Sequence, residues 1–168
     1  NDEPFARTGN PHDELRETYI AIRNNDPNHP VMSMEQGSYG EAAKFVDIFG
    51  HDPYPGDTKD PLTYVAERRS AADEATQGIR PVNSLLQVMN WRGYFPTGDD
   101  LRSMIYQTFL EGGGSYGFFR FINASDAGDD LDETHLWEPL TEFTHNERED
   151  AFKAFVFEFR KHLTCRNL

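Results

Sequence analysis

Along the chain, segments whose apolar residues recur at helical spacing alternate with short, continuous apolar runs. Leu15, Tyr19 and Ile22 follow one another at intervals of four and three residues, which predicts a helix over 12–24 with one buried stripe. Short apolar runs at 31–34, 45–49, 81–89 and 116–122 predict strands, and helical patterns occupy 41–44, 61–77, 96–111 and 137–163. Regular alternation of this kind predicts an α/β fold with about four parallel strands joined by right-handed crossovers.

Polar side chains gather where the predicted strands end. The central example is the stretch 45–55, in which an apolar run is followed by a turn rich in Gly and Pro. The candidates are Glu35 after the first strand, His51, Asp52 and Tyr54 after the second, Gln87, Asn90 and Trp91 after the third, and Arg120 and Asn123 after the fourth. Because parallel strands end at one edge, these groups are expected to converge there.

Structural explanations compete with these functional ones. The Asp52–Pro55 stretch is also compatible with a rigid turn, and Trp91 and Phe95 with packing of a loop on the core. The triple glycine at 112–114 follows a helix and precedes a strand, the reverse of a phosphate-binding loop, so a tight turn is the better interpretation. The acidic segment 126–133 lacks the calcium-loop pattern and is interpreted as a solvated loop.

Composition narrows the classes of partner. The 168 residues are 37% hydrophobic and 13% aromatic, enough for one domain with a core but short for a complete eightfold β/α barrel. The formal net charge of −13 argues against nucleic acid or an anionic membrane as a partner and suits a neutral ligand, a cation or a sugar better. The only cysteine, Cys165, excludes an internal disulfide and leaves the cellular compartment open.

Several motifs together resemble a known family. Asp2-Glu3-Pro4 resembles the element at the end of the fourth strand in (β/α)8 glycoside hydrolases of the large retaining clan, where the Glu is the acid/base. The stretch 52–55 resembles the sixth-strand element of glycosidase-like bacterial barrels, and 81–87, 96–106 and 112–118 resemble their seventh strand, seventh helix and eighth strand. The resemblance implies that 1–168 is a single domain, the second half of a TIM barrel, with strands 5–8 and the loop after strand 4.

The implied chemistry is acid/base hydrolysis of a glycosidic bond. It needs two carboxyl groups, about 5–5.5 Å apart for retention or about 6.5–9.5 Å apart for inversion. Glu3 is the implied acid/base, but Gln87 stands where the clan carries its nucleophilic Glu, so Glu35 or Asp52 would have to supply the second carboxyl group. The other candidates, His51, Tyr54, Asn90, Trp91, Arg120 and Asn123 together with Gln87, would bind the saccharide; no cofactor or metal is expected.

Two further function classes stay open. A carbohydrate-binding domain derived from such a barrel would keep the cleft without turnover. An assembly module would pair its uncovered strand faces and edges with the missing barrel half or with a second copy of itself. A metal hydrolase built on Glu35, His51 and Asp52 is a weaker hypothesis, because no pair of histidines has ligand spacing.

Overall fold

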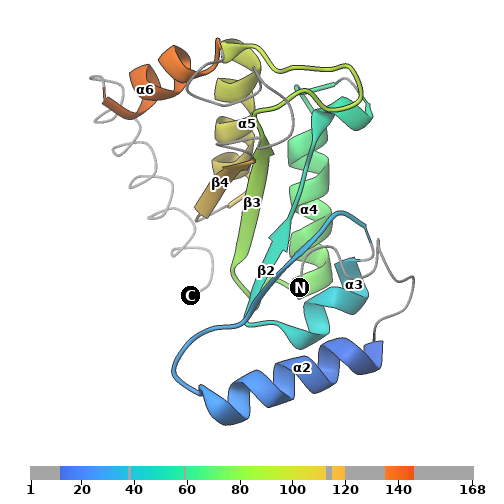
Figure 1. Cartoon of the computed structure of the whole chain (residues 1–168). Helices are drawn as coiled ribbons and strands as arrows, with labels where there is room; N and C mark the ends of the chain where they lie inside the picture. Colours follow the sequence, from blue (N-terminus) through green and yellow to red (C-terminus); the bar gives the residue numbers. More distant parts are fainter. Residues whose placement is uncertain (1–11, 38, 59, 113–114, 120–134, 146–168) are drawn as a thin grey trace, which may run out of the picture.

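A computed structural model describes residues 12–37, 39–58, 60–112, 115–119 and 135–145. Its elements are α2 (His12–Asn25), β1 (Met32–Glu35), α3 (Tyr39–Ala42), η1 (Ala43–Phe45), β2 (Ile48–His51), η2 (Pro55–Asp57), α4 (Tyr64–Thr76), β3 (Val82–Gln87), α5 (Gly98–Leu110), β4 (Ser115–Phe119) and α6 (Trp137–His145) (Figure 1). No described helix is long and apolar enough to cross a membrane.

The four strands form one parallel sheet in the order β1-β2-β3-β4. Each strand is followed by helical structure before the next strand, so the expected α/β alternation is confirmed. The register joins Glu35 to His51 and His51 to Ser84, which aligns the carboxyl ends of β1 and β2 beside the middle of the longer β3. In Figure 1 the carboxyl ends of β2 and β3 point to the upper end of the molecule, and α2 lies at the lower end.

Helices cover one face of this sheet. Under α4, α5 and α6, the core contains Val65, Leu86, Leu101, Met104 and Ile105. A second cluster joins α2, α3 and α4 to β2 and the start of β3; it contains Leu15, Tyr39, Val46, Phe49, Ala72 and Val82. The alternate positions on the other face, including Met34, Asn83, Leu85 and Gly117, are only half-buried. A parallel sheet is ordinarily covered on both faces, so this face has the character of an open barrel interior.

Local sequence explains where the main helices begin and end. At the start of α5, Thr97 and Asp100 form a capping box, in which each side chain accepts a hydrogen bond from the other residue's backbone N–H. The helix α4 ends with Gln77 and Gly78 at positive φ, which gives the usual left-handed termination. The side chain of Gln107 in α5 accepts from the N–H of Ala66 and so satisfies a donor in the first turn of α4.

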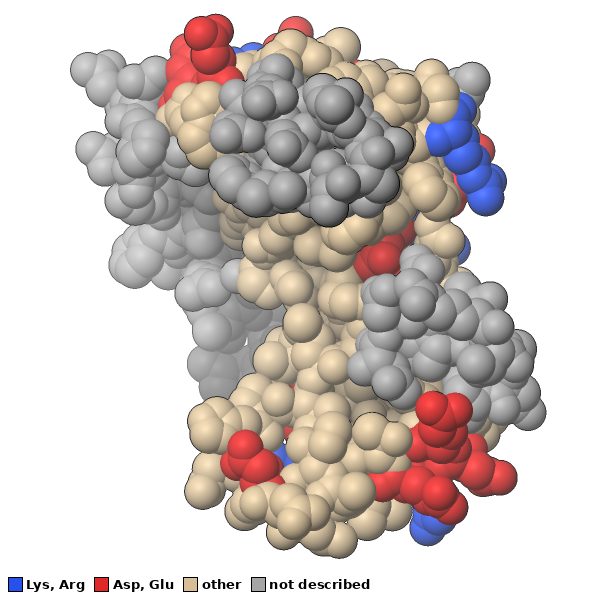
Figure 2. All heavy atoms as spheres, in the orientation of Figure 1, with Lys and Arg blue, Asp and Glu red and all other residues tan. Residues whose placement is uncertain are grey.

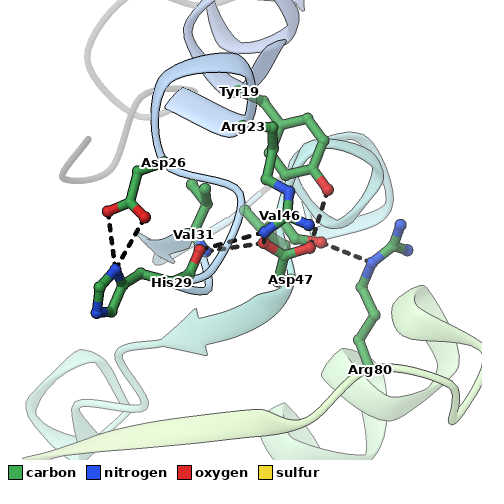
Figure 3. Close-up of polar contacts among 8 residues, drawn as sticks. All are labelled: Tyr19, Arg23, Asp26, His29, Val31, Val46, Asp47 and Arg80. Carbon is green, nitrogen blue, oxygen red and sulfur yellow. Dashed lines mark hydrogen bonds and ion pairs between the residues drawn. The ribbon is translucent and has the colours of Figure 1, made fainter. Parts of the chain in front are cut away.

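Asp47 joins several elements at the amino ends of β1 and β2 (Figure 3). Its carboxylate accepts hydrogen bonds from the backbone N–H of Val31 and the hydroxyl of Tyr19, both at 2.8 Å, and pairs with Arg23 at 3.7 Å. The hydrogen bond from Val31 lowers the pKa of the Asp47 carboxyl, as do Tyr19 and Arg23. This end of the sheet is therefore held by polar contacts between α2 and the strands.

The second strand begins later than the sequence predicts. Phe45 ends the 3-10 helix η1, and the ladder starts at Ile48. Val46 is extended, but the N–H groups of Asp47 and Ile48 both donate to the carbonyl of Val31 in the loop before β1. The apolar run is continuous in sequence, whereas its first half connects α3 to the sheet.

Candidate functional site

The carboxyl edge of the sheet brings together most of the described candidate residues. Glu35, His51 and Gln87 are the last residues of β1, β2 and β3, while Asp52 and Tyr54 follow β2 and Trp91 follows β3. Asn90 is exposed in the loop after β3. Glu3, Arg120 and Asn123 lie outside the described residues.

Glu35 and His51 belong to a buried row on the helix-covered face. The register aligns Glu35, His51, Ser84 and Tyr116 across the four strands, and the first three are completely buried. His51 Nε2 and Ser84 Oγ are 2.7 Å apart, and the ring of Tyr39 from α3 packs edge-on against the imidazole at 5.9 Å. Tyr116 packs against α5. In this arrangement neither Glu35 nor His51 reaches solvent.

Burial fixes the charge state of His51. Desolvation, followed by the positive charges of Arg69 and Arg68, lowers the pKa of His51 from 6.5 to about 3. Its Nδ1 atom is buried with no hydrogen-bond partner among the described residues. Asp52 comes next in the chain, is 3% exposed, and donates its backbone N–H to the carbonyl of Glu35 at 3.4 Å. His51 is therefore a neutral side chain at physiological pH.

Gln87 binds the protein's own backbone. Its side-chain oxygen accepts from the N–H of Gly56 at 3.0 Å, and its amide nitrogen donates to the carbonyls of Met89 and Tyr94, each at 2.9 Å. The residue is completely buried. The amide thus joins the loop after β2 to the loop after β3, and three backbone groups occupy the hydrogen-bonding positions that a ligand would need.

Three aromatic side chains form a cluster where β2, β3 and β4 end. Tyr54 packs edge-on against Trp91 and stacks on Phe119, with ring centroids 6.0 Å apart in both pairs and an interplanar angle of 19° in the second. Tyr54 is buried, Trp91 is half-buried, and Phe119 is exposed enough to contact a ligand. We refer to Tyr54, Trp91 and Phe119 as the aromatic cluster.

Asp57 and Arg92 join this cluster, and sequence reasoning missed both. The Asp57 carboxylate accepts from Trp91 Nε1 at 3.0 Å and from the Tyr64 hydroxyl at 3.2 Å, and it pairs with Arg92 at 3.2 Å. The guanidinium of Arg92 also lies over the Trp91 ring, 5.6 Å from its centroid. Asp57 occurs in a polar loop with no distinctive pattern, and for the turn at Arg92 the only local sign is the glycine that follows it, Gly93.

A hollow lies at the other end of the sheet. It has a volume of about 790 Å³ and lies at the amino ends of β3 and β4, where Arg69, Arg80, Val82, Glu111 and Ser115 line it. In β/α barrels the amino end of the sheet generally serves stability and the carboxyl end carries the chemistry. The converging polar and aromatic groups at the carboxyl edge are therefore a better candidate site than this hollow. No group of three or more metal-ligating side chains is present in the described ranges.

Comparison with known proteins gives a fold relationship. No protein-family model matches the sequence, and no curated protein matches it either. Among solved structures, the chain is similar to a Bacteroides thetaiotaomicron protein assigned as an alpha-L-fucosidase, with 13% identity, a TM-score of 0.54, and coverage of 78% of this chain and 50% of that one.

Two further glycoside hydrolases show the same degree of similarity. The glycoside hydrolase family 17 beta-1,3-glucanosyltransferase of Rhizomucor miehei has 10% identity and a TM-score of 0.54, over 77% of this chain and 54% of that one. The endo-1,4-beta-D-mannanase of Thermotoga petrophila has 14% identity and a TM-score of 0.54, over 78% and 50%. The chain thus spans about half the length of these structures. Its fold is a partial TIM barrel whose structural neighbours are glycoside hydrolase barrels.

Proposed function

We propose that this chain is part of a glycoside-hydrolase-like barrel that binds a saccharide at the carboxyl edge of its sheet. The observation that carries the proposal is the aromatic cluster, three rings from three successive strand ends. Aromatic faces bind the apolar C–H surfaces of sugar rings, while nearby polar groups bind the hydroxyls. The fold of the neighbouring glycoside hydrolases supports the same site, because barrels place their ligands at this edge.

The proposed chemistry is hydrolysis with Glu3 as acid/base. Both candidates for the second carboxyl group are buried, Glu35 at 0% and Asp52 at 3% exposure, and Asp52 is preferred because it lies one position beyond the helix-covered row that contains Glu35 and His51. Gln87 cannot act as a nucleophile, since an amide is neutral and its side chain is bound to backbone groups. The roles of His51, Asn90, Arg120 and Asn123 in holding the sugar stay predictions.

A complete barrel requires further strands. The half-buried face of the sheet, with Met34, Asn83 and Leu85, would become the barrel interior once the missing half, or a second copy of the chain, covered it. The second candidate function is a carbohydrate-binding domain without turnover. The observation that favours it is the occupied amide of Gln87 at the position where the clan carries its nucleophile.

The first test is retardation of the complete protein in native gels that contain beta-1,3-glucan or beta-1,4-mannan, together with hydrolysis of a panel of 4-nitrophenyl glycosides. We expect retardation by at least one polymer and a weakening of about fivefold or more in Trp91→Ala. The matched control is Trp137→Ala, because Trp137 in α6 is also partly exposed but lies outside the aromatic cluster.

Two outcomes would decide against the proposal. Absence of both retardation and hydrolysis in the complete protein contradicts saccharide binding. An equal loss of affinity in Trp91→Ala and Trp137→Ala contradicts the position of the site. If the protein binds and hydrolyses a glycoside, Glu3→Gln should abolish hydrolysis and leave binding unchanged; binding without hydrolysis in the wild type identifies the carbohydrate-binding domain instead.

A further inference from the structure

The loop after β3 ends in a tight turn that holds an arginine in an unusual backbone conformation. Trp91 and Tyr94 exchange two backbone hydrogen bonds, at 2.9 and 3.0 Å. Between them Arg92 has φ of 53° and Gly93 has φ of 77°. Two successive positive φ angles are typical of a type I′ turn, whose first central position favours Asn, Asp or Gly. Arg92 occupies that position although the positive φ is unfavourable for an arginine. Residues held in such a conformation often have a functional side chain.

One edge of the Arg92 guanidinium is fixed by the protein. Nη1 lies 3.2 Å from Asp57 Oδ1, and the group lies over the Trp91 ring. Asp57 is itself held by Trp91 Nε1 and by the Tyr64 hydroxyl, so its carboxylate is a fixed partner for the guanidinium. A guanidinium carries five N–H donors in a planar fork, and Asp57 engages it through Nη1. The arginine is oriented before any ligand arrives.

The rest of the guanidinium is open to solvent. The side chain of Arg92 is 64% exposed, whereas that of Asp57 is 20% exposed. In Figure 2, a basic side chain stands beside acidic atoms at the upper right, and acidic side chains are visible at both the upper and the lower end of the molecule. Arg92 is thus an exposed positive group on a chain whose net charge is −13.

We propose that Arg92 binds the carboxylate of an acidic sugar unit whose ring contacts the aromatic cluster. A carboxylate is planar and matches two parallel N–H groups of a guanidinium, which gives a short, charge-assisted pair. The inference rests on the proposed saccharide-binding function and adds the class of sugar. Asp57 is the positioning residue of this subsite, because it fixes both Trp91 and Arg92.

The net charge of the protein limits the ligand to few acidic units. A polyuronate would carry one negative charge on every sugar and would be repelled by the acidic surface as a whole. A single carboxylate in contact with Arg92 is attracted directly by the guanidinium. The protein's acidic groups farther than about 8 Å from it are largely screened at physiological salt. The expected ligand is therefore a uronic acid within an otherwise neutral saccharide.

The test compares matched sugars that differ at one carbon. Isothermal titration of the complete protein would use 4-nitrophenyl β-D-glucuronide against the β-D-glucoside, and the corresponding galacturonide against the galactoside. We expect one acidic member to bind at least about fivefold tighter than its neutral partner, and this ratio to decrease as salt is raised. In Arg92→Asn the ratio should fall to about one with the affinity for the neutral sugar retained, because Asn tolerates the left-handed backbone and lacks the charge.

The control variant and the possible outcomes distinguish failure of the acidic subsite from failure of the saccharide-binding function on which it rests. Arg16→Gln removes the same charge from an exposed position in α2 and should leave the ratio unchanged. Equal affinities within every wild-type pair, or a ratio that persists in Arg92→Asn, would overturn the acidic subsite alone. Binding of no member of either pair would overturn the saccharide-binding function and this subsite together.

Discussion

Replacing Gln87 by Glu introduces a carboxyl group at the end of β3, and we expect it to destabilise the protein without creating a nucleophile. Gln87 donates two hydrogen bonds to the carbonyls of Met89 and Tyr94 and accepts one from the N–H of Gly56. A protonated Glu has a single O–H donor, so one carbonyl loses its partner. An ionised Glu has no donor, and its charge would face both carbonyl oxygens.

The magnitude follows from burial and from these three contacts. Loss of one buried hydrogen bond costs about 1–3 kcal/mol at acidic pH, where the carboxyl group is protonated. Because position 87 is completely buried, the folded state should keep the group protonated and raise its pKa far above the unfolded value of about 4.3. A raised pKa makes the unfolded state lose the proton first, so the free energy of unfolding falls by about 1.4 kcal/mol per pH unit above that value, or about 4 kcal/mol between pH 5 and pH 8.

Urea unfolding at pH 5 and pH 8, followed by tryptophan fluorescence, measures this effect. The wild type gives the pH dependence of the remaining groups, and Gln87→Met removes the same hydrogen bonds without adding a titratable group. We expect Gln87→Met to lose about 2–4 kcal/mol equally at both pH values. If Gln87→Glu were destabilised by the same amount at pH 5 and pH 8, the side chain would not be enclosed by the two loops and the reasoning would fail.

Two more predictions concern the same end of the sheet. Gly56→Ala places a methyl group against the carbonyl oxygen of Trp91, so thermal unfolding should show a loss of about 1–3 kcal/mol. Gly40→Ala, with nothing within 4 Å of the added methyl group, should not lose stability; equal stability of the two variants would contradict the close approach. His51, with its folded pKa lowered to about 3, stays neutral while the unfolded state gains a proton as the pH falls below 6.5. Stability is therefore complete above pH 6.5 and is lost towards pH 3, by about 2 kcal/mol between pH 7 and pH 5. His51→Gln should remove that slope from urea unfolding curves, and parallel curves for variant and wild type would contradict the assignment.

The elements were predictable from local patterns, and their exact limits were not. The helix at 12–24 follows from the spacing of Leu15, Tyr19 and Ile22, and the structure has it at His12–Asn25. The run 45–49 looked like one strand because Phe45 and Val46 favour β-structure. Their placement depends on where the ladder begins, which is set by the hydrogen bonds of Asp47 and Ile48 to Val31, 16 and 17 residues away.

The gathering of polar side chains at one edge was predictable from sequence, because parallel topology brings the strand ends together. Their individual contacts were not predictable. The hydrogen bonds of Gln87 could not be predicted from local sequence, because one of its partners, Gly56, is 31 residues away in the chain. Which face of the sheet a side chain occupies also decides its access, and the alternation that buries His51 beneath α3 depends on a register that local sequence does not specify.

In the turn at 91–94, the residues that hold the backbone shape differ from the residue that carries the charge at the tip. Its backbone is closed by Trp91 and Tyr94 and held from below by Gln87, so its shape does not depend on the side chain at position 92. Substitution there by Gly, Asn or Asp is compatible with the positive φ and would change the charge of the tip without disturbing the fold. In the proposed acidic subsite, ligand preference would therefore change through one residue, while the backbone that presents it stays constant.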